Sequence, residues 1–219
     1  NLAKLSSIGF VDGFYYVPRV DKDIIKTHKE GLIALTGNLH GIIPNLILNV
    51  GEAQAEEEFK WWVDTFGDDF YVEINRHDLD EEKHLNRILL TFAEKYNVKI
   101  IASNNVYYLD KEDANSHDIL LCVKDGEQQS TPIGKGRGYR YGFPNDEFYF
   151  KSSQQMQELF TDLPEAIDNI TALIAKIESY TLAREVLLPK FDIPEKFLDP
   201  KDAEDGGKRG ENSYLRHLT

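Results

Sequence analysis

The chain has 219 residues, with 25 Lys and Arg against 38 Asp and Glu, and a formal net charge of −13 at pH 7. This length fits one domain, or one domain and part of another. The negative charge repels a phosphate backbone and argues against an autonomous nucleic-acid-binding protein. No apolar run approaches the roughly 18 residues of a membrane span, and the single cysteine, Cys122, excludes a disulfide framework.

The two ends of the chain suggest a piece of a longer protein. The chain starts at Asn1, and its one methionine is Met156. A helix predicted from Asn212 stops at Thr219 after little more than one turn, which is too short to be stable alone. We therefore expect an interior segment of a larger cytoplasmic α/β protein.

A series of strands and helices is predicted across the first half of the chain. Apolar runs indicate strands, and apolar residues at three- and four-residue spacing indicate helices. The predicted elements are a strand at 32–37, a helix at 52–66, a strand at 70–74, a helix at 80–97 capped by Asp80, and a strand at 98–102. This β-α-β-α-β order predicts parallel strands joined by right-handed crossovers. It fits an open doubly wound sheet or a closed barrel, and periodicity does not choose between them.

The pattern is weaker in the second half of the chain. We predict helices at 113–123, at 152–160 with Ser152 or Ser153 as N-cap, and from Pro164 to about 177, with a short strand at 148–150. Residues 124–147 are a long polar stretch with several glycines. Residues 187–210 are rich in Pro, Gly and charge, which predicts a linker or an extended crossing.

Polar side chains follow each strand of the first half at its carboxyl end, where parallel α/β folds place functional groups. They are Asn38 and His40 after the first strand, Glu73 and His77 on and after the second, and Asn105 and Tyr107 after the third. Divalent ions that act on phosphates prefer carboxylates and neutral imidazoles, and only Glu73, His77 and His40 qualify. Two or three scattered ligands do not hold zinc or manganese tightly.

Each candidate ligand also has a structural interpretation. His77 is either a loop histidine hydrogen-bonded to a neighbour or one ligand of a partial metal site. Glu73 is either a carboxylate paired with a nearby arginine or a ligand, and His40 is either a turn residue or a ligand. Cys122 lies in an apolar run, which indicates a buried structural thiol rather than a catalytic one.

A short basic segment stands out in this acidic chain. Lys135, Arg137 and Arg140 alternate with glycines and with aromatic residues that include Tyr139. Glycine lets the backbone approach a phosphate, arginine pairs with phosphate, and tyrosine can stack on a base. The segment is either a solvated loop without a partner or a contact for DNA or another domain.

Eight stretches of the chain are informative when taken together. They are residues 13–21 (GFYYVPRVD), 30–33 (EGLI), 70–74 (FYVEI), 102–109 (ASNNVYYL), 117–122 (HDILLC), 162–166 (DLPEA), 187–191 (LLPKF) and 214–216 (YLR). In this order they resemble the bacterial replicative DNA polymerase III alpha family, the C-family of polymerases. Any one stretch alone would be weak, but the resemblance covers nearly the whole chain.

The resemblance implies a fold, a set of partners and a division into domains. Residues 1–180 would form the C-terminal part of a polymerase-and-histidinol-phosphatase (PHP) domain, a distorted (β/α) barrel, and residues 181–219 a linker and the start of a palm domain. The family's palm carboxylates, which bind Mg²⁺, lie outside this chain, so no catalytic or cofactor-binding residue is assigned. The implied partners are the rest of the polymerase, its proofreading exonuclease and other replisome subunits, and DNA through the parent protein; no membrane is implied.

This chain departs from the metal-binding members of that family at three positions. Those members carry Cys where this chain has Asn38, Asp where it has Asn105, and His where it has Tyr107, whereas His77 matches an expected ligand position. We therefore hypothesise a vestigial metal site at these four positions, with Glu73 as a further candidate member. We expect no metal to bind there, and we expect the domain to serve as a structural and protein-docking platform. An active metal-dependent phosphoesterase or proofreading domain, and a pure interaction module, are the alternatives.

Overall fold

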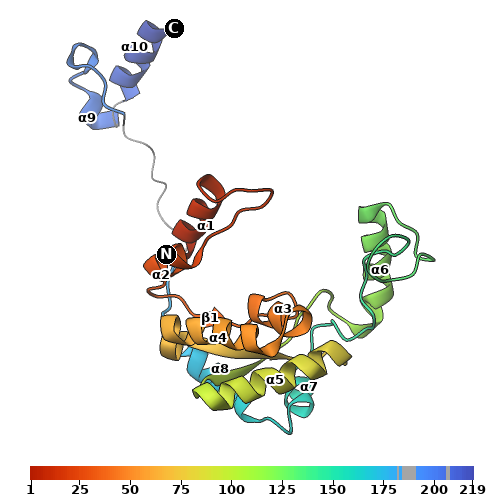
Figure 1. Ribbon diagram of the computed structural model, residues 1–219. Coiled ribbons are helices and arrows are strands. Elements are labelled where there is room, and N and C mark those ends of the chain that lie inside the picture. The colour runs from red at the N-terminus through yellow and green to blue at the C-terminus, as the bar shows by residue number, and fades with distance from the viewer. Residues whose placement is uncertain (182, 184–190, 206–207) are drawn as a thin grey trace. The chain divides into compact units, whose positions relative to one another are not determined.

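The computed structural model describes residues 1–181, 183, 191–205 and 208–219 (Figure 1). They fall into two compact units, Asn1–Ile177 and Glu178–Thr219, which are treated separately. The first unit contains, in order, α1 (Leu2–Val11), α2 (Lys22–His28), β1 (Ala34–Leu35), α3 (Ile42–Asn49), α4 (Glu52–Phe66), η1 (Gly67–Asp69), β2 (Phe70–Asn75), α5 (Asp80–Tyr96), β3 (Lys99–Ser103), η2 (Lys111–Asp113), α6 (Ala114–Asp125), α7 (Ser153–Leu159) and α8 (Glu165–Ile174).

The three strands form one parallel sheet in the order β1-β2-β3. Ala34 of β1 is in register with Phe70 of β2, and Asn75 at the end of β2 is in register with Ser103 of β3. Spatial order therefore follows chain order, which confirms the predicted parallel β-α-β-α-β arrangement. The register also brings the carboxyl ends of β2 and β3 to the same edge of the sheet.

The crossover helices α4 and α5 pack on the same face of this sheet. Phe59 of α4 and Leu89 of α5 lie in one hydrophobic cluster with Val72 and Ile74, and all four side chains are fully buried. Strands in chain order with both helices on one face are the arrangement of a barrel segment, whereas a doubly wound sheet places helices on both faces. The fold is thus a mixed α/β structure with the parallel strands of a barrel fragment.

Local sequence explains why α5 begins and ends where it does. Its first turn carries three acidic residues, which favour the positive end of the helix dipole. Asn97 ends the helix in the left-handed region at φ 52°, and its N–H bonds to the carbonyls of Ala93 and Glu94. Asp80, however, is the first residue of the helix, and Leu79 occupies the N-cap, so the predicted capping role of Asp80 is wrong by one position.

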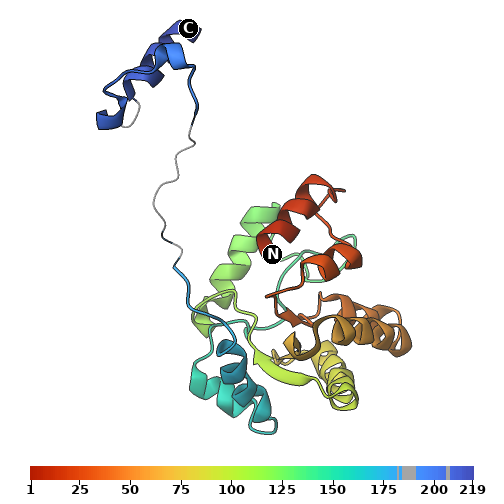
Figure 2. The ribbon, with the colours of Figure 1, turned by 90° about the vertical axis from the view of Figure 1, so that its left-hand side faces the viewer.

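The helices after the sheet close the core at β3. Ser152 caps α7 in a reciprocal capping box with Gln155, as its position in the sequence predicts. Helix α8 starts after Pro164 and lies beside β3 (Figure 2). There Asn169 Nδ2 donates to the Ile100 carbonyl at 2.9 Å, which satisfies a polar group at the edge of the sheet.

Several elements differ from their predictions. The first strand is confined to Ala34–Leu35, and the segment 148–150 makes a single bridge between Tyr108 and Tyr149 in place of a strand. Helices α1, α2 and α3 were not predicted, because they are short and lack a long amphipathic pattern. Asp21 caps α2 by accepting the Ile24 N–H at 2.9 Å, a signal that was present in the sequence.

The second unit contains η3 (Glu195–Phe197), α9 (Asp202–Asp205) and α10 (Lys208–Leu218). The prediction of a linker at 187–210 is therefore wrong where it covers these helices; residues 187–190, which include most of the LLPKF stretch, lie outside the described residues. Helix α10 starts at Lys208 and not near Asn212, since Asp202 Oδ1 accepts the Gly210 N–H at 3.0 Å and holds the chain in this turn. The assignment of 181–219 to a linker and the start of a palm domain stays a prediction.

Within the described ranges, none of the helices combines the length and apolar character needed to cross a membrane.

Candidate functional site

The segments that follow β2 and β3 meet at His77. Its side chain is 1% exposed and stacks on Phe148, with ring centroids 4.5 Å apart and an interplanar angle of 6°. The His77 Nδ1 atom lies 2.7 Å from Glu82 Oε1, and the His77 backbone N–H donates to Glu82 Oε2 at 2.5 Å. The backbone N–H of Asn105 donates to His77 Nε2 at 3.2 Å.

These contacts fix the protonation pattern of the imidazole. Nε2 accepts a hydrogen bond from Asn105, so its lone pair faces an N–H and carries no proton. The ring proton therefore sits on Nδ1 and points at the Glu82 carboxylate. Both ring nitrogens of His77 are accordingly in use, and the lone pair that a metal would need is already engaged.

Glu82 is a functional partner that sequence reasoning did not find. It lies in the first turn of α5 and is 4% exposed, in contrast to its neighbour Glu81, which faces solvent. Three acidic residues in the first turn of a helix are explained by their favourable interaction with the helix dipole, so the sequence gives no reason to single out Glu82. The available signal was its spacing: the turn between β2 and α5 places residues 77 and 82 on facing positions.

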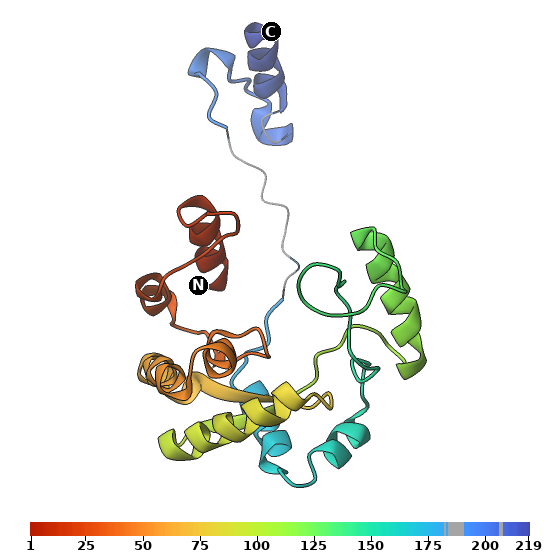
Figure 3. The ribbon, with the colours of Figure 1, turned by 45° about the vertical axis from the view of Figure 1, so that its right-hand side comes forward.

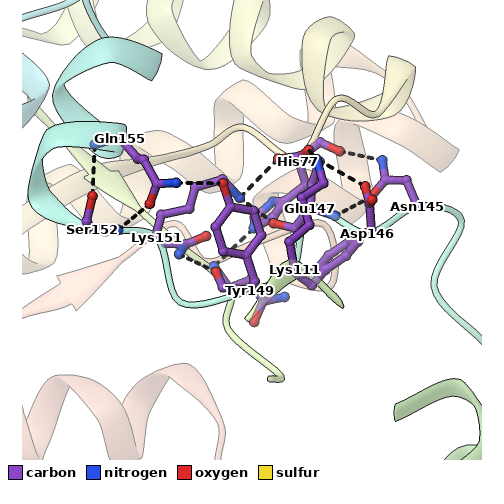
Figure 4. Close-up of polar contacts among 12 residues, drawn as sticks. His77, Lys111, Asn145, Asp146, Glu147, Tyr149, Lys151, Ser152 and Gln155 are labelled. Carbon is purple, nitrogen blue, oxygen red and sulfur yellow. Dashed lines mark hydrogen bonds and ion pairs between the residues drawn. The ribbon is translucent and has the colours of Figure 1, made fainter. Parts of the chain in front are cut away.

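A set of charged residues surrounds the His77 turn (Figure 4). Asn145 Nδ2 donates to the His77 carbonyl at 2.7 Å. Glu147 pairs with Lys111 at 2.5 Å and with Lys151 at 3.3 Å. The hydrogen bond from Lys111, followed by that from Lys151, lowers the pKa of the Glu147 carboxyl against an opposing effect of burial. The loop 145–151 is thus tied to both the η2 helix and the end of β2.

The other predicted site residues have separate roles. Asn38 Oδ1 accepts the His40 N–H at 3.0 Å, so this pair forms a turn after β1, and no hydrogen bond described in the structure joins it to His77. Glu73 Oε1 accepts from Asn75 Nδ2 at 3.3 Å, and no ion pair joins Glu73 to an arginine of the described ranges, so that alternative is not observed there. Asn75 Oδ1 is buried and lacks a hydrogen-bond partner among the described residues.

Tyr107 belongs to an aromatic cluster at the same edge. Its ring lies 4.5 Å from the ring of Phe143, 5.9 Å from that of His117 and 6.1 Å from that of Phe148, centroid to centroid. Tyr107 is 45% exposed, and Phe148, which stacks on His77, connects its ring to the His77 ring. Within the described part of the chain, no group of three or more His, Cys, Asp or Glu side chains is arranged to hold a metal ion.

Arg140 differs from its expected place in the basic segment. Its side chain is 4% exposed and forms a two-pronged ion pair with Asp118 of α6, at 2.6 and 2.9 Å. Its Nε atom also donates to the Thr131 carbonyl at 2.9 Å. Because the guanidinium is committed to these acceptors, Arg140 is not exposed to solvent as a contact residue would be, whereas Lys135, Arg137 and Tyr139 are exposed.

We expect Asp118→Asn to lower the free energy of unfolding of the first unit by about 1.5–3 kcal/mol at pH 7, the range for hydrogen bonds to charged groups. The Arg140 hydrogen bond lowers the pKa of Asp118, so the contribution of the pair is fully present above the ordinary carboxyl pKa of about 3.9. It is lost as pH falls through the lower folded pKa. Urea denaturation at pH 7 and about pH 3 should show the mutant–wild-type difference shrinking in acid, while the exposed control Glu112→Gln shows no such difference.

Comparisons with known proteins place this geometry in a family. Residues 1–77 match the family model of the PHP domain. The parallel barrel segment, with polar residues gathered at the carboxyl ends of its strands, is therefore a PHP-domain fold.

Over its whole length the chain is similar to curated DNA polymerase III alpha subunits. It is 36% identical to that of Borreliella burgdorferi over 220 residues, 34% to that of Treponema pallidum over 219, and 36% to that of Thermus aquaticus over 229. Each match covers 100% of this chain but 18%, 17% and 17% of the relative, respectively. The chain thus belongs to the DNA polymerase III alpha family as a PHP-domain segment, and it spans less than a fifth of the length of these relatives.

Proposed function

We propose that this chain is part of a replicative DNA polymerase in the cytoplasm, and that its PHP domain is a metal-free structural and docking platform. The similarity to DNA polymerase III alpha subunits along the whole chain supports the parent activity. In this proposal the Mg²⁺ ions of DNA synthesis bind at the palm of the parent protein, outside this chain. The domain supports that palm and, as the family resemblance implies, offers a surface to the proofreading exonuclease and other replisome subunits.

The main support for a metal-free domain is that both ring nitrogens of His77 are engaged in hydrogen bonds. Its Nε2 lone pair accepts the Asn105 N–H, and its Nδ1–H points at Glu82. A ligand role would break one of these two hydrogen bonds in a buried place, where an unpaired polar group costs about 1–3 kcal/mol.

The neighbouring positions also do not fit a divalent metal. Asn105 offers an amide in place of a carboxylate, and Tyr107 places a phenol in an aromatic cluster. Asn38 is engaged in the turn with His40. Carboxylates, imidazoles and thiolates are the ligands that hold such ions, so the residues present do not fit the family's metal centre.

Metal analysis and chelator treatment test this proposal together. We expect the polymerase that contains this chain, purified without chelator, to carry less than one tightly bound zinc, manganese or iron per chain by mass spectrometry. Its exonuclease subunit should remain bound in a pull-down after dialysis against chelator, because docking does not depend on a metal.

The variant His77→Gln serves as the matched control. Glutamine removes the imidazole but keeps a polar side chain, so the metal content should be the same as in the unmodified polymerase. Two or three tightly bound ions that disappear in His77→Gln would contradict the proposal and favour the active phosphoesterase.

A further inference from the structure

The segment between α6 and α7 carries two basic residues, Lys135 and Arg137, that alternate with glycines. We call residues 134–139 the basic loop. Lys135 and Arg137 are exposed, and within the part of the chain that the structure describes neither side chain forms an ion pair. Gly136 and Gly138 have φ values of 91° and 89°, a conformation that residues with a side chain rarely adopt. A Cβ atom at either position would meet nothing within 4 Å, and both residues are exposed, so a ligand can approach their backbone.

Arg140 holds the two ends of the basic loop together and ties them to helix α6. Its backbone N–H donates to the Pro132 carbonyl at 2.9 Å, and its carbonyl accepts the Gly134 N–H at 3.1 Å. The buried guanidinium then pairs with Asp118 of α6. Figure 3 shows the segment after α6 curving back toward that helix. The ends of the basic loop are therefore joined to each other and to a helix, which reduces the entropy that a ligand contact would have to offset.

Tyrosines flank the two cations. Tyr139 and Tyr141 are 52% and 53% exposed. A Cβ atom at Gly134 would lie 2.4 Å from a ring carbon of Tyr139, so the absence of a side chain at 134 gives the Tyr139 ring its place. Exposed tyrosines beside arginine are common where proteins contact nucleic acid backbones and bases.

From these features we infer that the basic loop binds the phosphate backbone of DNA, an inference that rests on the proposed function because that function brings DNA to this chain. Arg137 would form paired hydrogen bonds with a phosphate, and the Tyr139 hydroxyl would contact the same strand. Arg140 and Asp118 are positioning residues. Lys135 also lines a groove of ≈ 970 Å³ with Asp78, Asp80 and Glu81, so nearby acidic charge offsets part of its attraction and Arg137 supplies the main contact.

The test compares DNA binding by the polymerase and by its loop variants. Fluorescence anisotropy with a primer–template duplex, measured over a range of salt concentrations, gives the affinity and its salt dependence. Removing one phosphate contact makes the plot of log affinity against log salt shallower by about 1. We expect that change, with a severalfold loss of affinity at low salt, for Arg137→Ala and a loss of affinity for Tyr139→Phe. Lys4→Ala, an exposed lysine on α1, is the matched control and should bind as the unmodified polymerase does.

Each outcome bears on the loop separately from the proposed function. Primer extension by the unmodified polymerase tests the proposed function, whereas the difference between variant and unmodified protein in duplex binding tests the loop. Equal affinity and equal salt slope for Arg137→Ala would overturn the inference. So would unchanged DNA binding accompanied by loss of a replisome subunit in a pull-down, which would assign the loop to a protein partner.

Discussion

Replacing Phe59 by alanine should lower the free energy of unfolding of the first unit by about 3–5 kcal/mol, the range for Phe-to-Ala changes in packed cores. Phe59 has no exposed surface. Its ring centroid lies 5.2 Å from that of Phe70, 5.4 Å from that of Phe92 and 5.6 Å from that of Tyr96. It therefore joins α4, the central strand and α5, and its removal leaves a cavity that touches all three.

Tryptophan fluorescence during urea denaturation measures this loss directly. The chain has two tryptophans, Trp61 and Trp62, and both lie on α4 close to the substituted position. The control is Phe150→Ala, because Phe150 is 66% exposed and its removal leaves no internal cavity. A loss below about 1 kcal/mol for Phe59→Ala would mean that α4 does not form the core described here.

The sequence predicts the sheet and its crossover helices well because each carries a strong local signal. In α4 and α5 the apolar residues recur at helical spacing over 15 and 17 residues, and β2 is buried along nearly its whole length. Helix α3 has no such signal. Its eight residues are apolar on most sides, and only its packing against α4 distinguishes it from a buried strand.

The candidate site is less predictable because it depends on contacts between distant segments. The sequence places His77 and Asn105 after adjacent parallel strands, and the structure joins them by a hydrogen bond. That Nε2 would accept from a backbone N–H, and not bind a metal, depends on a loop path that no local pattern encodes. Arg140 is a similar case. Its place in the basic segment predicts an exposed residue like Arg137, but its ion pair with Asp118 of α6 buries the side chain.

The Glu82 carboxylate accepts both hydrogen bonds that hold His77 against α5, so we expect its loss to destabilise the turn after β2. We expect Glu82→Ala to lower the free energy of unfolding by about 2–6 kcal/mol, because two buried donors lose their acceptor and each unsatisfied buried group costs about 1–3 kcal/mol. The change leaves the His77 backbone N–H and the Nδ1–H without acceptors in a buried place. The measurement is again urea denaturation at pH 7.

The matched control is Glu81→Ala, one position earlier on α5. It removes the same charge from the same helix turn, but its side chain is exposed, so its cost should stay below about 1 kcal/mol. If the two variants lost equal stability, the helix dipole would explain both losses and the His77–Glu82 pair would contribute nothing of its own.

A double-mutant cycle then separates a structural pair from two independent residues. Because the His77 side chain and Glu82 share the Nδ1–H···Oε1 hydrogen bond, the losses from His77→Ala and Glu82→Ala should not add. The coupling between them should lie within the 0.5–3 kcal/mol usual for residues in direct contact. Nitrogen NMR of the unmodified protein should show the His77 proton on Nδ1, since Nε2 accepts from Asn105. A proton on Nε2 would mean that Nε2 does not accept the Asn105 N–H. The lone pair would then lie on Nδ1, and His77 could bind a metal through that atom.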